Sequence, residues 1–206
     1  MKINKKTIQK MGIATLVMSG ILLIANSALA AETAVWTTVS VTGSIAENVS
    51  LNVDEELRFG DISGPSLVRQ NTDLSVSLKV NDLVSTITGY RNTSTGEHRP
   101  YVGLGLALLR GNLSLDSSTK LELRELETIR GRTELTASAD VSGVTAWLTE
   151  EVFGDSSGIT GNRASIGVTK GINKTFGVSA YYLLDTAGTD FGNSTHVLGL
   201  GLGVSL

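Results

Sequence analysis

The sequence predicts an all-β protein: a transmembrane antiparallel up-and-down β-barrel of about 10–12 strands, preceded by a cleaved signal peptide. Three observations predict this class. Large apolar residues alternate with small or polar residues in one segment after another. The first thirty residues have the composition of an export signal. No later apolar run reaches the roughly 18 residues that a membrane-spanning helix needs.

The last ten residues show the alternation most clearly. Period-2 alternation marks a strand whose two faces meet different surroundings. One face carries Leu198, Leu200, Leu202, Val204 and Leu206, and the other carries Gly199, Gly201 and Gly203. A face of leucines suits contact with lipid, and a face of glycines suits a narrow lumen. We expect these glycines to make room for long lumen arginines or to let the strand curve.

Residues 1–30 have the features of a signal peptide. Four lysines and no acidic residue precede an apolar stretch at residues 12–25, and Ala28-Leu29-Ala30 supplies the small residues of a cleavage site. The chain contains no cysteine, so it has neither disulfides nor a lipid-anchored cysteine. We therefore expect a mature protein of one domain, an outer-membrane β-barrel over residues 31–206.

Strand-like alternation occurs in eleven segments: 35–45, 49–59, 67–80, 83–91, 101–110, 113–124, 129–141, 144–153, 162–171, 175–184 and 194–206. Short turns recur about every 30 residues, the length of one hairpin of membrane-spanning strands. Longer links, such as the glycine-rich stretch 154–161, lie between them. This spacing predicts short periplasmic turns and longer external loops. Because antiparallel closure needs an even number of strands, we expect ten wall strands, with the segment 35–45 outside the wall, and twelve as the next possibility.

A soluble β-sandwich is the alternative architecture, because it also has short alternating strands. The segments found here have nine residues or more, whereas strands of soluble proteins have about 5–6. They also lack a second set of large residues to form a sandwich core. The barrel is therefore the favoured architecture. Its alternation places Leu104 toward lipid and Gly103 toward the lumen, so we expect Gly103 to accept a serine.

Charged residues fall on the inward face of the predicted strands. An arginine on the lipid face would cost about 2–4 kcal/mol near the middle of the bilayer, so the alternation places these charges in the lumen. The predicted lumen charge network consists of Glu56, Arg58, Arg91, Glu122, Arg124, Arg130, Arg132, Glu134, Glu151 and Arg163, with Asp54 on the same face. We expect arginine–carboxylate pairs to fill a narrow barrel. The alternative is a small polar or anion-favouring pore.

Enzymatic chemistry has little support in the sequence. His98 and His196 are the only histidines, and Glu150 and Glu151 are adjacent and so point to opposite faces of a strand. A lipid-modifying enzyme could use Ser194 with His196 as its base, but the sequence offers no third member of a triad. We expect both to be rim residues at the headgroup level. The prediction is a protein with no enzymatic activity, cofactor or metal.

Several short motifs occur in a fixed order along the chain. They are Glu56-Leu57-Arg58-Phe59, Gly89-Tyr90-Arg91, Glu97-His98-Arg99-Pro100-Tyr101, Arg130-Gly131-Arg132, Glu151-Val152-Phe153, and Arg163 with Gly167. In order and spacing they resemble the Gram-negative outer-membrane family catalogued as a domain of unknown function, number twenty-four ninety. The resemblance covers most of the chain after the signal. It implies an outer-membrane barrel and no established activity or catalytic residues.

Charge and export signal together predict location and partners. The 17 basic residues include the four signal lysines, so the 20 acidic residues outnumber the remaining basic ones by seven. This excess argues against a nucleic-acid partner. The expected location is the cell outer membrane. The expected partners are outer-membrane lipid and, during biogenesis, the barrel-assembly machinery.

Overall fold

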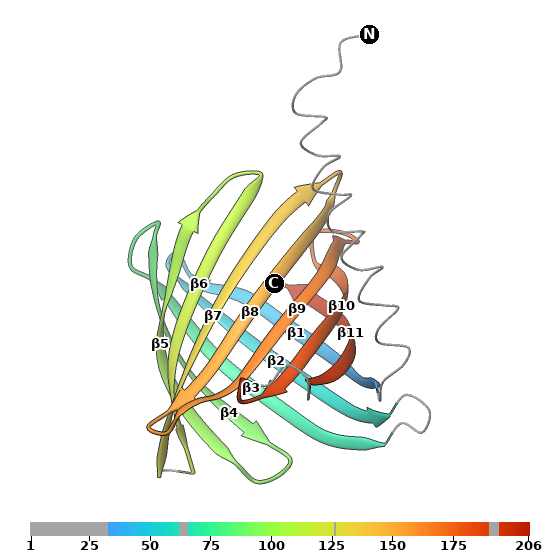
Figure 1. The fold of residues 1–206 in the computed structure, drawn as a ribbon. Helices are drawn as coiled ribbons and strands as arrows, with labels where there is room; N and C mark the ends of the chain where they lie inside the picture. Colours follow the sequence, from blue (N-terminus) through green and yellow to red (C-terminus); the bar gives the residue numbers. More distant parts are fainter. Residues whose placement is uncertain (1–32, 62–65, 126, 190–193) are drawn as a thin grey trace.

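A computed structural model describes residues 33–61, 66–125, 127–189 and 194–206, and they form a closed β-barrel of eleven strands (Figure 1). The strands are β1 (Thr33–Ala46), β2 (Val49–Asp61), β3 (Leu67–Lys79), β4 (Val84–Thr93), β5 (His98–Leu109), β6 (Leu113–Arg124), β7 (Thr128–Val141), β8 (Val144–Asp155), β9 (Gly158–Gly171), β10 (Phe176–Ala187) and β11 (Ser194–Ser205). The predicted signal peptide lies outside the described residues. Each predicted strand segment corresponds to one strand of the barrel.

The barrel closes where its first and last strands pair in parallel. Every other neighbouring pair is antiparallel, in chain order from β1 to β11, and β1 then lies beside β11 with Trp36 opposite Gly199. The predicted β-barrel of about 10–12 strands is confirmed, but its expected even strand number and wholly antiparallel closure are wrong. The segment 35–45 belongs to the wall, because a parallel pair satisfies the free edges of β1 and β11 without requiring an even number of strands.

The two rims of the barrel differ less than the sequence predicts. We call the rim with the connections β1–β2, β3–β4, β5–β6, β7–β8 and β9–β10 the turn rim, and the opposite rim the loop rim. The predicted loop at 154–161 is wrong: β8 runs to Asp155 and β9 begins at Gly158, so two residues connect them. The β8–β9 ladder extends to the pair formed by Asp155 and Gly158, so the glycine-rich stretch 154–161 belongs mostly to the two strands.

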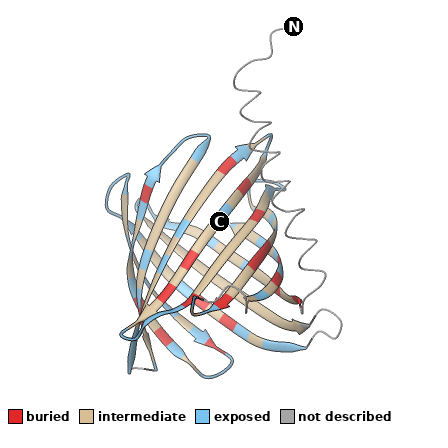
Figure 2. Ribbon diagram, in the orientation of Figure 1, coloured by how far each residue is buried: buried red, intermediate tan, exposed pale blue. Residues whose placement is uncertain are grey.

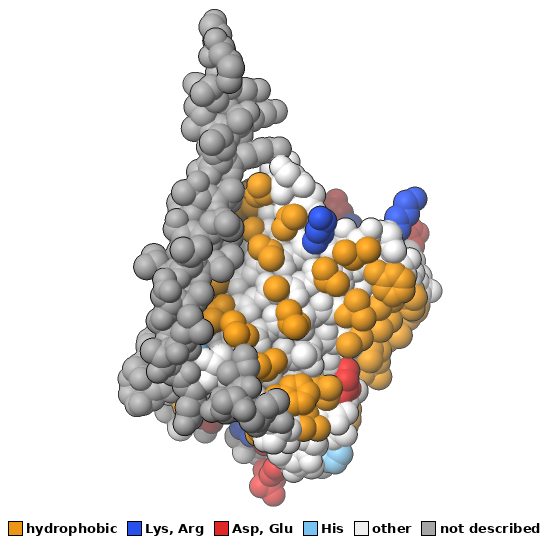
Figure 3. All heavy atoms as spheres, turned by 90° about the vertical axis from the view of Figure 1, so that its right-hand side faces the viewer, with side chains coloured by type: hydrophobic (Ala, Val, Ile, Leu, Met, Phe, Trp, Pro, Cys, Tyr) orange, Lys and Arg blue, Asp and Glu red, His pale blue; other side chains and the backbone are white. Residues whose placement is uncertain are grey.

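The outer face of the wall is apolar. Leu104, Val102 and Leu200 are among the many large hydrophobic side chains that are exposed on it. Figure 3 shows such side chains spread over one outer face, with charged side chains near its edges. Among the described residues, no helix is long and apolar enough to cross a membrane. The wall thus presents lipid-compatible side chains outward, which is the arrangement of transmembrane barrels.

The inward-facing glycines accommodate aromatic rings. A Cβ added at Gly199 would overlap the ring of Tyr181, and one at Gly89 would overlap the ring of Tyr101. Gly167 has Trp147 and Tyr181 against it in the same way. The expectation that these glycines make room for arginines is therefore wrong at Gly199, where Tyr181 of the adjacent strand takes the space, and at Gly201, where Ser179 takes it. Buried positions lie on many strands around the wall (Figure 2).

Candidate functional site: a charged layer in the lumen

Inward-facing charges gather in a layer across the half of the lumen nearer the loop rim. We call this set the charged layer: Glu56 and Arg58 (β2), Asp73 (β3), Arg91 (β4), Glu122 (β6), Arg130 and Arg132 (β7), Glu151 (β8), Arg163 (β9) and Asp185 (β10). The pleat explains its existence, since each of these residues except Arg132 has an apolar, outward-facing neighbour in sequence. The closed register then brings charges from distant parts of the chain to similar depth.

A continuous series of ion pairs crosses six strands of the layer. Starting at β2, it runs Glu56–Arg58 (2.6 Å), Arg58–Asp185 (4.0 Å), Asp185–Arg163 (2.9 Å), Arg163–Glu151 (3.4 Å), Glu151–Arg132, Arg132–Glu122 (3.7 Å) and Glu122–Arg130 (3.0 Å from Nε). Carboxylates and guanidiniums alternate along it, so each charge has an opposite neighbour on both sides except at the ends. Such charge-assisted bonds are stronger than neutral ones, particularly away from water.

The acids at the centre of this series are almost completely buried. The exposed fraction is 1% for Glu122 and 5% for Glu151. Glu151 contacts both Arg132 and Arg163, and Glu122 contacts both Arg130 and Arg132. An ionised carboxylate away from water is tolerated only when it is paired and hydrogen-bonded. The pairing therefore explains how the lumen can hold these acids.

Aromatic side chains hold the guanidiniums of the layer in place. Arg130, Arg163 and Arg132 lie 4.8, 4.9 and 5.8 Å from the ring centroid of Phe153. Arg58 lies 3.8 Å from the ring centroid of Trp36. A guanidinium stacked on an aromatic face keeps its N–H edges free for carboxylates. The rings thus fix the arginines without competing for their donors.

A smaller group completes the layer on β3, β4 and β5. Asp73 accepts bonds from Arg91 (2.7 Å) and from the hydroxyl of Tyr101 (2.5 Å). Asn71 links this side to the first series, because its side-chain amide donates to Glu56 at 2.6 Å. Arg91, Tyr101 and Asn71 all face inward, from β4, β5 and β3, so the layer continues across this part of the wall.

Glu97 forms a separate cluster in the β4–β5 connection at the loop rim. Its carboxylate pairs with Arg69 (3.0 Å), Arg124 (2.5 Å) and Arg99. Burial raises the pKa of Glu97, but hydrogen bonds and charges from Arg124 and Arg99 outweigh that effect and lower the pKa to about 2. Because the pKa is lower in the folded state, the cluster contributes its full stability above the unfolded value near pH 4–5. That contribution is lost as the pH falls toward about 2.

The variant Glu97→Gln tests this cluster. We expect the urea midpoint of the wild type to fall between pH 5 and pH 2.5 by more than that of Glu97→Gln, because only the wild type must protonate this carboxylate. Glu47→Gln, on an exposed turn at the turn rim, is the control and should follow the wild type. Equal acid sensitivity of all three proteins would contradict the assignment.

The structure places the ten predicted charges unevenly. Eight of them are in the charged layer: Glu56, Arg58, Arg91, Glu122, Arg130, Arg132, Glu151 and Arg163. Glu134 lies at its edge, 37% exposed and 3.9 Å from Arg132, and Arg124 belongs to the Glu97 cluster. Asp54 is hydrogen-bonded to Asn52 at 2.5 Å, nearer the turn rim.

Several members of these networks were missing from the predicted set. Asp73 and Arg69 have the inward alternation on β3 and could have been included by that signal. Asp185 and Arg99 lie just beyond the predicted strand ends at residues 184 and 101, and Glu97 lies in a predicted loop. The alternation in the sequence fades near the rims. The predicted strands therefore end too early there and leave these residues out.

An apolar cluster and two cavities accompany the layer. Trp36, Leu183 and Val197 face inward and pack together, with Val197 fully buried. On the turn-rim side lies a cavity of about 380 Å³, lined mainly by Thr38, Ser40, Trp147, Thr169, Ser179 and Tyr181. On the loop-rim side lies a cavity of about 330 Å³ that includes Arg124, Arg130, Phe153, Arg163 and Asp185. The two cavities share no lining residue.

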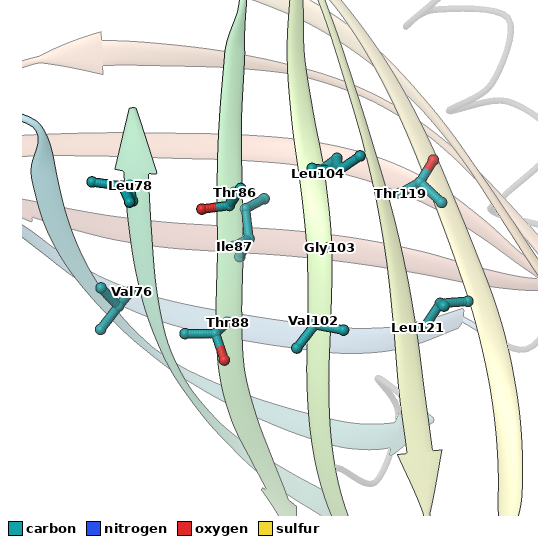
Figure 4. Close-up of a pocket in the computed structure, with 10 residues that line it drawn as sticks. All are labelled: Val76, Leu78, Thr86, Ile87, Thr88, Val102, Gly103, Leu104, Thr119 and Leu121. Carbon is teal, nitrogen blue, oxygen red and sulfur yellow. The ribbon is translucent and has the colours of Figure 1, made fainter. Parts of the chain in front are cut away.

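A third hollow of about 610 Å³ lies on the outside of the wall, over β3–β6. Figure 4 shows its residues, in which Thr86, Thr88 and Thr119 lie between larger apolar side chains. All its lining residues except Ile87 and Gly103 have outward alternation. It is a shallow dip that short threonine side chains leave in a lipid-compatible surface.

The candidate residues for enzymatic chemistry have other partners. His196 is hydrogen-bonded through Nδ1 to the hydroxyl of Tyr182, and Oγ of Ser194 lies 2.6 Å from Oγ1 of Thr186. His98, expected in a loop, begins β5, and its Nδ1 lies 2.5 Å from the hydroxyl of Tyr90. The described part of the chain contains no group of three or more metal-ligating side chains.

The closed wall, its apolar outer face and its charged interior have the arrangement of a transmembrane β-barrel. A solved structure entitled "NanC porin structure in rhombohedral crystal form" has a similar fold, with a TM-score of 0.51 and 10% identity, over 71% of this chain and 78% of that chain. Residues 33–194 match the family described as "Protein of unknown function (DUF2490)", and the chain belongs to that family. No curated protein matches the chain in sequence.

Proposed function

We propose that this protein is a non-enzymatic barrel of the bacterial outer membrane whose lumen is closed to ions by the charged layer. The burial of Glu122 and Glu151 carries the proposal: a water-filled channel at their depth would expose these carboxylates. Eight-stranded barrels are filled by side chains and barrels of 16 or more strands leave aqueous channels, so eleven strands allow either state. Here, the inward-facing arginines Arg58, Arg132 and Arg163 and the Trp36 cluster are largely buried, which supports the closed state.

A passive pore is the second candidate function. The similarity to a porin structure favours it, and so do the two cavities, which would be the vestibules of a channel if the layer between them opened. In that case the arginines would line a polar constriction that selects anions. The two functions differ in one measurable property, the conductance of the resting barrel.

Planar-bilayer recording of the purified, refolded protein tests the proposal. We expect no stepwise conductance from the wild type, and a measurable conductance from Trp36→Ala. The Trp36 cluster packs against Tyr181, which lines the turn-rim cavity, and the Trp36 ring lies against Arg163, which lines the loop-rim cavity. Trp147→Ala is the matched control: it removes a second inward tryptophan, but one that lines only the turn-rim cavity. A heat-dependent shift on gels and recovery in the outer-membrane fraction establish that each variant is folded and inserted. Sustained steps from the wild type would establish the pore instead.

A further inference from the structure

The cavity on the loop-rim side has the properties of a binding site for a small anion. Its volume of about 330 Å³ lies at the lower end of the range for small-molecule pockets. Three arginines from three strands line it, Arg124, Arg130 and Arg163, and Asp185 is the one carboxylate among its lining residues. Apart from Asp185, the acids that pair with these arginines do not line the cavity. The lining therefore carries an excess of positive charge within low-dielectric walls.

Two of these guanidiniums have donors to spare. Each guanidinium has five N–H donors in a rigid fork. Arg124 uses one N–H on Glu97, and Arg130 uses two on Glu122. Arg163 is more fully engaged, with bonds to Asp185 and Glu151. Arg124 and Arg130 can therefore donate to a ligand without giving up the ion pairs that hold the barrel together.

The site is also rigid where a ligand would bind. Arg130 and Arg163 lie against Phe153, which is itself buried and lines the cavity. Gly161 lines it as well, and a Cβ there would come within 3.3 Å of Phe153. Pre-positioned donors lose little entropy on binding, which is a main determinant of affinity for small ligands.

We infer that this cavity binds a small molecule or headgroup through a carboxylate or phosphate, with Arg124 and Arg130 as its hydrogen-bond donors. Planar guanidiniums suit both groups because they form two parallel N–H···O bonds. With the lumen closed as proposed above, the charged layer forms the inner side of the cavity, so a ligand enters from the loop rim and leaves by the same route. The ligand comes either from the medium or from a lipid whose phosphate reaches over the rim.

Calorimetric titration of the detergent-solubilised protein with inorganic phosphate and with succinate tests the inference. We expect binding by the wild type and a loss of about tenfold or more in affinity for Arg124→Gln, since it removes a charge-assisted donor. Arg69→Gln is the matched control, because Arg69 also pairs with Glu97 but does not line the cavity. Its affinity should stay within about twofold of the wild type.

A second arm separates the two sources of the ligand. Native mass spectrometry of the protein with added phosphatidylglycerol should show retained lipid that Arg124→Gln loses if the phosphate comes from a lipid. Binding of free anions without lipid retention places the ligand in the medium. No binding in either arm, or an equal loss in Arg69→Gln and Arg124→Gln, would overturn the inference. Conductance plays no part in these readouts, so they stand or fall separately from the proposed closed lumen.

Discussion

The variant Glu151→Ala is expected to lower the free energy of unfolding by about 3–5 kcal/mol. Glu151 is 5% exposed and is the shared partner of Arg132 and Arg163 in the middle of the ion-pair series. Removing it leaves Arg163 with Asp185 and Arg132 with Glu122 at 3.7 Å, so the buried layer gains one uncompensated positive charge. Unbalanced charge away from water is the costly case. Urea unfolding in lipid vesicles, followed by tryptophan fluorescence, measures the change.

Glu134→Ala is the matched control for this prediction. Glu134 also faces the lumen and lies directly opposite Glu151 in the β7–β8 ladder, but it is 37% exposed and its closest ion-pair distance is 3.9 Å, to Arg132. We expect a loss of about 0–1 kcal/mol, as for exposed pairs. If Glu151→Ala cost equally little and changed ion selectivity instead, the layer would be wet and the pore would be the better description.

The variant Leu104→Arg is expected to destabilise the inserted barrel by about 2–4 kcal/mol, or to prevent insertion. Leu104 is exposed on the outer face of β5, where an arginine would meet hydrocarbon. The cost depends on depth because a long side chain close to a rim can extend to the headgroups. Folding yield into vesicles, read as the fraction that migrates in the heat-sensitive form, checks the prediction.

The control for Leu104→Arg is Ser118→Arg on the neighbouring strand β6. Ser118 lies opposite Gly105 and Glu134 in the two ladders it joins, so an arginine there enters the lumen beside a carboxylate. We expect nearly normal insertion. Gly103→Ser, expected from the alternation to be mild, is unsuitable, since an added Cβ would overlap the backbone oxygen of Thr119. Equal failure of Leu104→Arg and Ser118→Arg would show that the assignment of faces is wrong.

The sequence predicted the strands well because each one faces two different environments. Alternation such as that of Val102 and Leu104 with Gly103 reports which side meets lipid, and it placed eight of the ten predicted charges in one layer. The alternation carries no information on which charged residues form ion pairs with one another. Arg91 pairs with Asp73, which was outside the predicted set, because the choice depends on the register between strands.

Other features depend on contacts that a single strand does not reveal. The position of the Tyr181 ring on Gly199 follows from the pairing of these two residues across β10 and β11. The alternation predicts eleven strand segments, but a wholly antiparallel closure requires an even number, so the sequence pattern alone favours ten or twelve wall strands. Both ends of the wall contribute to that closure, so neither β1 nor β11 alone could show that they run in the same direction.

The parallel closure also places the two ends of the wall on opposite sides of a membrane. In a barrel with an even number of strands, the first strand starts and the last strand ends in the same aqueous compartment. Here β1 starts at the loop rim, with Thr33 opposite His196, and β11 ends at the turn rim, with Ser205 opposite Thr42. The wall therefore begins on one side of the bilayer and finishes on the other. With the turn rim on the periplasmic side, as the sequence predicts, insertion would carry the start of β1 across the membrane together with the loops. An even-stranded barrel has no such step, because both ends of its wall stay on the periplasmic side.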